Sequence, residues 1–316
     1  MPDLSSYNLM TASEKLEAER LAGLYDSNTP TISPYTDAYY QRMNNIIQGV
    51  DTYWLALGLR TAFSQRHSIY VDGGENNVRW GVELNYNGNN GVMQKSDRNV
   101  TGAGFYIDYR IGKFQVKNKT TFTFGNSNDV PFNSFSDYSH LNPYLRIYDE
   151  DGNYLRKLES FSGYAGTLVN PLYEIHNYNS YDKTKYYEIV DNLLVNWNIT
   201  KDLRLRLQMS ATIKRENSEL YKDPASASYG TGNLAMNGDK SVSSGDSNVI
   251  DGTLQLMYNK SIKKHYMNLN LSSNLRSSQY TTEYADYRGF PGGDLTSSNY
   301  AAEIINKPSR NDQRSR

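Results

Sequence analysis

Residues 203–214, LRLRLQMSATIK, alternate strictly between apolar and polar side chains. The apolar series opens with Leu203, Leu205 and Leu207, and the polar series opens with Arg204 and Arg206. Successive side chains of a β-strand point to opposite faces of its sheet, so this segment predicts a strand with one apolar and one charged face. A dry protein core could not hold the unpaired arginines. We therefore expect the strand to lie between an apolar environment and a wet one.

Seven further segments show the same two-residue period. In residues 78–86, VRWGVELNY, the apolar series includes Trp80, Val82 and Leu84, and the polar series includes Arg79 and Glu83. The other six predicted strands cover residues 63–71, 104–111, 114–124, 187–199, 249–259 and 265–275. The sequence therefore predicts an all-β chain of about eight strands.

Short and long connections alternate between these strands. The short ones are residues 73–77, 112–113, 200–202 and 261–264, and the longest loops run from about 126 to 185 and from about 216 to 247. Consecutive hairpins then place the short turns at one end of the sheet and the long loops at the other, which is typical of an outer-membrane β-barrel. In such a barrel the lipid-facing residues include Trp80, Val82, Leu84, Leu203, Leu205 and Leu207, and the lumen-facing residues include Arg79, Glu83, Arg204 and Arg206.

The composition fits a barrel wall and argues against several other classes of protein. Lys plus Arg total 33 against 34 for Asp plus Glu, so no excess of positive charge points to nucleic acid. The mean hydropathy is −0.72, as expected when apolar residues occupy alternate positions and form no run of about 18 that could span a membrane as a helix. The lack of cysteine excludes disulfides, thiolate metal sites and thiol nucleophiles.

Residues 1–62 predict short helices that pack on a larger structure. Thr11 and Glu14 have the spacing of a capping box ahead of the segment EKLEAERLAGLY. A proline-containing turn separates this helix from AYYQRMNNIIQGV. The chain opens Met1-Pro2-Asp3 instead of with a basic and then apolar stretch, so no signal peptide is expected in this sequence.

Two groups of polar residues resemble chemical sites, and in each a structural explanation is favoured. Asp149, Asp151 and Asn153 look like the start of a calcium loop, but no Glu occupies the twelfth position, which favours a turn stabilised by their side chains. Ser64 and His67 are close in sequence but have no acidic partner. The four histidines are dispersed. We therefore predict no enzyme, no metal and no cofactor.

Six segments follow one another in the order SYNLMTASEKLEAERLAGLY, VDTYWLALGLRTAFSQRHSIYVDGG, NYNGNNGVMQKSDRN, NPYLRIYDEDGN, NPLYEIHN and LRLRLQMS. Together they resemble the SusC/RagA family of TonB-dependent outer-membrane transporters, up to about residue 298. The resemblance implies a barrel of about 22 strands that imports an oligosaccharide or a peptide. It also implies a SusD-like surface lipoprotein as a lid, and TonB acting through a plug domain in the lumen.

Relative to that family, the chain lacks a plug domain, a TonB box and a terminal aromatic strand. We therefore expect an antiparallel up-and-down transmembrane β-barrel fragment located in the cell outer membrane, which would not transport alone. Residues 1–62 would form a post-plug helical segment, and residues 63–281 the strands with short periplasmic turns and long extracellular loops. Residues 282–316 would form a truncated loop and a polar tail.

The long loop between residues 126 and 185 is rich in tyrosine. Aromatic faces combined with planar polar groups bind sugars, so these tyrosines are candidate contacts with substrate or with the lid lipoprotein. The alternative, which is favoured, is that they pack the loop upon itself. The candidates are Tyr138, Tyr144, Tyr148, Tyr154 and Tyr164.

Two other functions are compatible with the same pattern. One is a soluble all-β glycan-binding module, and the other is a complete eight-stranded outer-membrane barrel of the small adhesin type. Closure of the sheet separates them from a fragment. Pairing of residues 63–71 with residues 265–275 would indicate the small barrel, whereas an open curved sheet would indicate part of a larger one.

Overall fold

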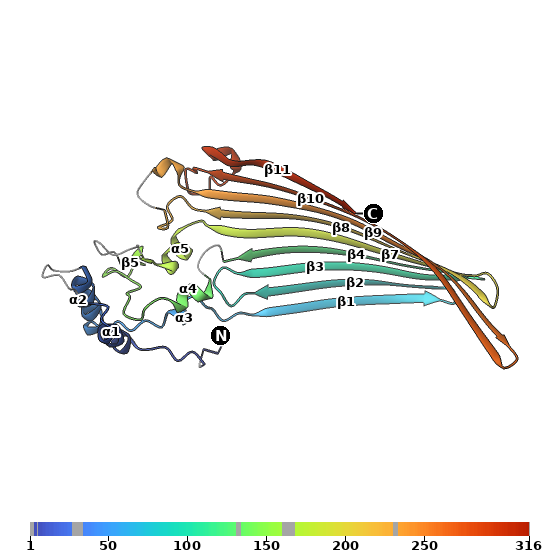
Figure 1. The fold of residues 1–316 in the computed structure, drawn as a ribbon, viewed down its shortest axis with the longest axis horizontal. Helices are drawn as coiled ribbons and strands as arrows, with labels where there is room; N and C mark the ends of the chain where they lie inside the picture. The colour runs from blue at the N-terminus through green and yellow to red at the C-terminus, as the bar shows by residue number, and fades with distance from the viewer. Residues whose placement is uncertain are drawn as a thin grey trace.

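The computed structural model describes residues 3–4, 6–26, 34–130, 134–159, 168–229 and 233–315. Most of these residues form one large antiparallel sheet, which we call the wall (Figure 1). The α-helices lie together at one end of it. Within the described residues, no helix is long and apolar enough to cross a membrane.

The wall contains nine strands in the order β1-β2-β3-β4-β7-β8-β9-β10-β11. Each strand pairs antiparallel with its neighbours, and neighbours in the sheet are also consecutive among the wall strands along the chain. This confirms the predicted up-and-down antiparallel sheet. The strands are β1 (Ser64–Glu75), β2 (Val78–Asn90), β3 (Asp97–Ile111), β4 (Phe114–Asp129), β7 (Tyr181–Asn198), β8 (Leu203–Lys222), β9 (Asp239–Ile262), β10 (His265–Arg288) and β11 (Glu303–Ser315).

The tight turns lie at one end of the wall and the long connections at the other (Figure 1), as the alternation of loop lengths predicted. The first turn differs in detail from the expectation. Gly73 and Gly74 lie inside β1, and Asn76 adopts the left-handed conformation with φ 36° instead. Asparagine tolerates this region better than most residues, because its short polar side chain can hydrogen-bond locally.

Several strands run well beyond the predicted segments. β8 ends at Lys222 and β9 begins at Asp239, so much of the segment predicted as a loop is paired strand. β9 and β10 have 24 residues each, whereas about 9–11 residues cross a bilayer. The extension is rich in Ser, Gly and Asp and lacks the alternation of apolar residues that revealed the rest of the wall. Its backbone is held by ladder pairing on both sides.

Residues 303–315, predicted as part of a polar tail, form the ninth strand, β11. This strand pairs with the last part of β10, and the register shifts between Tyr284 and Asp286, opposite the segment that contains Pro308. A proline has no N–H to donate, and an edge strand with an irregular register accommodates it. The described residues therefore form nine wall strands where about eight were predicted, and the additional strand lies in the segment predicted as a tail.

The wall is an open sheet. In the part of the chain that the structure describes, β1 pairs only with β2, and β11 pairs only with β10. β10, whose pairing with the first strand would have closed a small barrel, pairs with β9 and β11 instead. The wall therefore has the form of part of a larger barrel, and the complete eight-stranded barrel is not the observed fold.

Five short helices form a compact unit at the long-loop end, which we call the loop-end assembly. They are α1 (Ala12–Leu21), α2 (Pro34–Ile47), α3 (Trp54–Leu57), α4 (Phe135–Ser139) and α5 (Pro171–Asn177), accompanied by the ribbon β5 (Lys157–Glu159) and β6 (Leu168–Val169). Two 3-10 turns, η1 (Leu234–Met236) and η2 (Ser298–Tyr300), lie in later connections. The core of the assembly includes Trp54, Leu55, Tyr144 and Leu145, so the N-terminal segment and the long insertion share it. The predicted capping box of Thr11 and Glu14 is present at α1.

A buried ion cluster fastens these two segments together. The Arg42 guanidinium donates two hydrogen bonds of 2.7 Å to the Glu159 carboxylate and one of 2.7 Å to the Tyr25 hydroxyl. It also lies over the Tyr144 ring, 4.8 Å from the ring centroid. The Tyr144 hydroxyl donates to Glu19 at 3.1 Å, and burial raises the pKa of this hydroxyl above its usual range. Each charged group of the cluster therefore has an ionic or hydrogen-bonding partner although the cluster is largely shielded from water.

The β4–β7 pair is joined by the long insertion, so no tight turn sets its register. On the apolar face, Asp191 of β7 lies opposite Thr120 of β4. The Asp191 carboxylate accepts hydrogen bonds from the Thr120 hydroxyl at 2.6 Å and from the Asn118 amide at 2.9 Å. These contacts satisfy a charge that would be costly on an apolar surface. Slipping either strand would break these contacts, so they favour the observed register.

Candidate functional site

The register separates the two predicted series of side chains onto opposite faces of the wall. Trp80, Val82 and Leu84 lie on one face, and Arg79 and Glu83 lie on the other. In β8 the series that opens with Leu203, Leu205 and Leu207 lies on the first face, and Arg204 and Arg206 lie on the second. We call the first the apolar face and the second the polar face.

The polar face is crossed by a chain of hydrogen bonds that links four strands. The Gln115 amide donates to Asp108 at 2.9 Å, the Asn196 amide donates to Gln115 at 3.3 Å, and the Arg206 guanidinium donates to Asn196 at 3.0 Å. Lys117 adds an ion pair to Asp108 at 3.2 Å. Polar groups on this face therefore hold one another in fixed positions.

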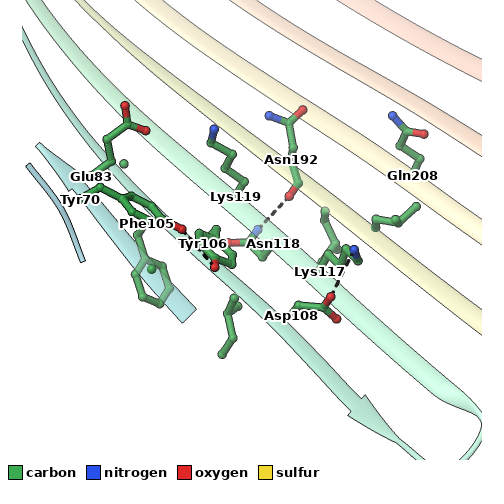
Figure 2. A pocket seen from close by; sticks show the side chains of 15 residues that line it. Tyr70, Glu83, Phe105, Tyr106, Asp108, Lys117, Asn118, Lys119, Asn192 and Gln208 are labelled. Atoms are coloured by element: carbon green, nitrogen blue, oxygen red, sulfur yellow. Dashed lines mark hydrogen bonds and ion pairs between the residues drawn. The ribbon is translucent and has the colours of Figure 1, made fainter. Parts of the chain in front are cut away.

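Beside this chain the polar face contains an open hollow of about 510 Å³ (Figure 2). Figure 2 shows the side chains of Glu83, Lys119, Asn192 and Gln208 standing on the same side of the sheet, while the Phe105 ring points to the other side. The residues that line the hollow include Tyr70, Glu83, Tyr106, Lys117, Lys119 and Gln208. A volume of this size is in the range that accommodates a small molecule or a short oligomer.

The floor of the hollow depends on a glycine beneath an aromatic ring. Gly81 lies opposite Tyr106 in the β2–β3 pair. A Cβ atom on Gly81 would approach the ring of Tyr106 to 2.2 Å, so only glycine allows this ring to lie flat on the sheet. The Tyr106 ring is parallel to that of Tyr70, with centroids 6.5 Å apart, and the two hydroxyls are hydrogen-bonded at 3.2 Å. The result is a pre-arranged aromatic surface beside charged groups.

The arrangement offers binding through aromatic, ionic and hydrogen-bonding contacts. The hollow combines carboxylates, ammonium groups and side-chain amides without a serine, threonine or histidine in its lining. Among the described residues, no group of three His, Cys, Asp or Glu side chains is placed to hold a metal ion. The residues present therefore offer ionic, hydrogen-bonding and aromatic contacts to a ligand.

Glu83 lies on the face predicted from its own strand, but the sequence of a single strand does not reveal the hollow. The residues it missed are Gly81, Gly104, Tyr106 and Lys119, which come from three adjacent strands. A signal was present, because Gly81 and Gly104 occupy polar-face positions inside otherwise alternating strands. Glycine at such a position marks a close approach of another group. Pairing the strands was needed to see that Tyr106 is that group.

The tyrosines proposed as ligand contacts divide into buried and accessible ones. Tyr138 and Tyr144 are 1% and 0% exposed and belong to the core of the loop-end assembly, so they cannot touch a substrate in this structure. Tyr148 is 44% exposed, and its ring lies 4.9 Å from that of the half-buried Tyr154. Tyr164 lies outside the described residues. The prediction of a contact with substrate or lid therefore remains for Tyr148 and Tyr154.

The turn between these two tyrosines is stabilised by its own side chains. The Asp149 carboxylate accepts hydrogen bonds from the backbone N–H groups of Asp151 at 3.0 Å and Asn153 at 2.8 Å. This is the side-chain-stabilised turn that the sequence favoured over a calcium loop. The ring of His176 stacks on Tyr154 with centroids 4.9 Å apart, and burial together with the charge of Lys95 lowers the pKa of this histidine.

The wall and its loops have a counterpart among solved structures. No protein-family model and no curated protein matches the chain. The RagAB peptide transporter matches with a TM-score of 0.77 and 14% identity, covering 97% of this chain and 37% of that one. The RagAB peptide importer matches in its closed-closed state with a TM-score of 0.78, 14% identity and coverage of 99% and 37%. In its open-open state the values are 0.76, 15%, and 97% and 36%.

These values indicate likeness of fold across nearly the whole of this chain. At such low identity the comparison does not extend to particular side chains. The chain spans less than two-fifths of the length of the chains that it matches. The wall therefore has the fold of one part of a larger transporter chain.

Proposed function

We propose that this chain is a section of the wall of an outer-membrane transporter of the SusC/RagA type, which imports an oligosaccharide or a peptide. One observation carries the proposal: nine up-and-down strands form an open sheet with an apolar face and a polar face, with tight turns at one end and long loops at the other. The likeness of fold to the RagAB chains supports it. So do the motifs that resemble this family.

The exposure of the apolar face favours a membrane protein over a soluble glycan-binding module. Val82 is 37% exposed and Leu269 is 59% exposed. Contiguous exposed apolar surface of this kind marks contact with a membrane or another protein. In the proposed orientation the apolar face contacts lipid, the polar face lines the lumen, and the loop-end assembly lies outside the cell.

The proposed orientation also assigns a side of the membrane to the N-terminal segment. Residues of α1 and α3 share a core with residues of α4 and α5 at the long-loop end of the wall, opposite the tight turns. If the tight turns are periplasmic, the segment belongs to the extracellular side. It would then lie near a SusD-like lipoprotein, while a plug domain reached by TonB would face the polar side of the wall. The proposed function is transport without chemical change of the ligand. Transport would require the lipoprotein and the plug domain in addition to this chain.

Single-cysteine labelling tests the orientation, because the chain contains no native cysteine. We expect Arg204→Cys, Arg206→Cys and Gln208→Cys, in protein embedded in lipid, to react with a water-soluble maleimide. The corresponding variants Leu203→Cys, Leu205→Cys and Leu207→Cys should be protected and instead report lipid contact through a bilayer-soluble quencher. Equal labelling of both series would refute a membrane wall and favour the soluble module.

A further inference from the structure

We propose that the apolar face of the wall binds the phosphate group of an anionic membrane lipid in a second hollow, at the edge of that face nearest the long loops. This assignment rests on the proposed membrane wall and adds a specific lipid partner for its outward surface. The second hollow, which we call the boundary hollow, has a volume of about 440 Å³. The side chains that line it include Thr101, Phe124, Lys185, Tyr187, Arg215 and Asn217.

The surface around the boundary hollow is complete within this chain. Its residues come from β3, β4, β7 and β8, which lie in the interior of the wall and are each paired on both sides (Figure 1). The boundary hollow opens on the apolar face, away from the side that a plug domain would occupy. Its chemistry therefore depends neither on further strands at the edges of the wall nor on a domain in the lumen.

The boundary hollow lies where the apolar part of this face ends. On β7, Trp197 beside the tight turn and Tyr187 at the hollow are ten residues apart, which is about 33 Å along a strand. With the strand tilt of about 40° found in barrels, this distance corresponds to a lipid-facing band about 25 Å tall, flanked by aromatic residues. Lys185 is the next residue of β7 on this face, so its ammonium group lies at the level of the lipid headgroups.

Two cationic side chains converge on the boundary hollow. Arg215 lies opposite Tyr187 in the β7–β8 pair, so Lys185 and Arg215 are diagonal neighbours. Such neighbours are about 7–8 Å apart, a separation that two long side chains can bridge through one phosphate group. The Arg215 guanidinium is positioned by Asp246 at 2.9 Å and by Asn248 at 3.1 Å. No carboxylate lines the boundary hollow itself, which favours an anion.

Apolar side chains continue from the boundary hollow toward the tight turns. Phe124 and Tyr187 are exposed, and Phe122 and Ile189 follow them on the same face. A lipid whose phosphate lay between the two cations would extend its acyl chains along these side chains. A free phosphate ion would gain only the ionic contacts, and phosphatidylcholine would bring a positive choline group beside its phosphate. The arrangement therefore favours a lipid with a net negative headgroup.

Quenching by spin-labelled lipids measures this preference close to the boundary hollow. The full chain, purified from the membranes of its native host with any chain that copurifies, carries Phe122→Cys labelled with bimane. It is placed in phosphatidylcholine nanodiscs that contain phosphatidic acid or phosphatidylcholine with a nitroxide on the acyl chain. We expect phosphatidic acid to associate about 10- to 30-fold more strongly, because each of two cations near the membrane surface contributes about fivefold. The same label at Leu271→Cys, on β10 outside the hollow, should show no such preference.

Lysine substitutions connect the preference to the boundary hollow. Lys185→Met removes one cation and should reduce the preference for phosphatidic acid about fivefold, whereas Lys185→Arg should retain it. Lys183→Met is the matched control, because Lys183 lies on the same strand and face but outside the hollow. Its ammonium group lies over the Tyr181 ring, 4.1 Å from the ring centroid. This control should leave the preference unchanged, and quenching by phosphatidylcholine should be the same in all three variants if the wall is intact.

Four outcomes would overturn the lipid site. The first is equal association of both lipids next to Phe122. The second is an equal loss of preference in Lys185→Met and Lys183→Met, which would reflect only the general charge of the surface. The third is loss of the preference in inorganic phosphate but not in sodium chloride of equal ionic strength, which would assign the hollow to the free ion. The fourth is quenching at Leu271 but not at Phe122, which would show that a protein covers the hollow.

Failure of the lipid site is distinguishable from failure of the membrane wall. In each of the four outcomes lipids still quench the label at Leu271, so the apolar face still contacts the bilayer. If neither labelled position is quenched by any lipid, the membrane wall itself is refuted, and with it the lipid site.

Discussion

Leu145 in the loop-end assembly is fully buried, whereas Leu271 on the apolar face of the wall is 69% exposed. The assembly closes around its own core, which draws on residues from α1, α3, α4 and α5. The wall has long ladders of backbone hydrogen bonds but leaves its apolar side chains open to the surroundings. The two regions are thus stabilised differently. The assembly is stabilised by packing of its own core, and the wall by backbone hydrogen bonds between strands and by contact of its apolar side chains with the surroundings.

Charged residues follow the same division. Arg42 in the assembly is almost completely buried and is held by a carboxylate, a hydroxyl and an aromatic ring. Arg206 on the wall is half-buried and donates to Asn196 on a face that we propose to be wet. Removing a partner is therefore expected to lower the free energy of unfolding strongly in the assembly, where water cannot replace the lost contact. On the wall the same change is expected to lower it only slightly.

The largest expected effect comes from Arg42→Met. This change leaves the Glu159 carboxylate without its cation and leaves Glu19 with the cation of Lys15 alone, which is expected to lower the free energy of unfolding of the assembly by about 3–5 kcal/mol. Hydrogen exchange measured by mass spectrometry should show faster exchange in α1 and α2 and unchanged exchange in the wall.

Arg20→Met is the matched control, because Arg20 forms an exposed pair with Glu17 at 2.7 Å on α1. Exposed pairs contribute little, so this variant should exchange like the unaltered protein. Similar acceleration in both variants would mean that the cluster around Arg42 is not a special source of stability.

The next effect compares two leucines. Leu145→Ala opens a cavity in the core and should lower the free energy of unfolding by about 2–5 kcal/mol. Leu271→Ala removes side-chain atoms from an exposed surface and should cost about 1 kcal/mol or less. Urea unfolding of both variants in the same lipid or detergent measures the difference. Equal losses would show that another protein segment covers the apolar face at Leu271.

The smallest effect is a dependence of the assembly on pH. The pKa of His176 is lowered in the folded state by burial and by the charge of Lys95, so the unfolded chain binds a proton more readily. Stability is then complete above the unfolded pKa of about 6.5 and falls as the pH decreases through that value. His176→Phe should keep the ring stacked on Tyr154 and flatten the decline. Exchange protection of residues 168–177 between pH 5 and 8 measures it, and protection that increased on acidification would contradict the expectation.

The strands of the wall could be predicted from the sequence wherever apolar and polar side chains alternate. Trp80, Val82 and Leu84 alternate with Arg79 and Glu83 because the two sides of the sheet differ, and that difference is visible in a single strand. The alternation of turn lengths then gave the topology. The strand β11 could not be predicted in this way. Its central residues are mostly polar on both faces, so no alternation of apolar and polar side chains marks it.

The site was harder to foresee than the fold. Glu83 was assigned to the correct face from its own strand, but the hollow requires Gly81, Tyr106 and Lys119 from three strands in one register. Tyr138 and Tyr144 show the opposite difficulty. Tyrosine in a polar loop resembles a ligand contact, and only the packing of the insertion against the N-terminal helices places both rings in a core.

The β4–β7 junction implies that the wall could be assembled from two separately synthesised pieces. Every other hairpin has its alignment constrained by a shorter connection. Here the alignment depends on contacts between the strands themselves, among them those of Asp191 with Thr120 and Asn118. A cut within the insertion would remove the covalent link between β4 and β7 but would leave these contacts between the strands in place. This is the point at which a foreign domain could be inserted, or the chain divided, while the two halves still recognised each other.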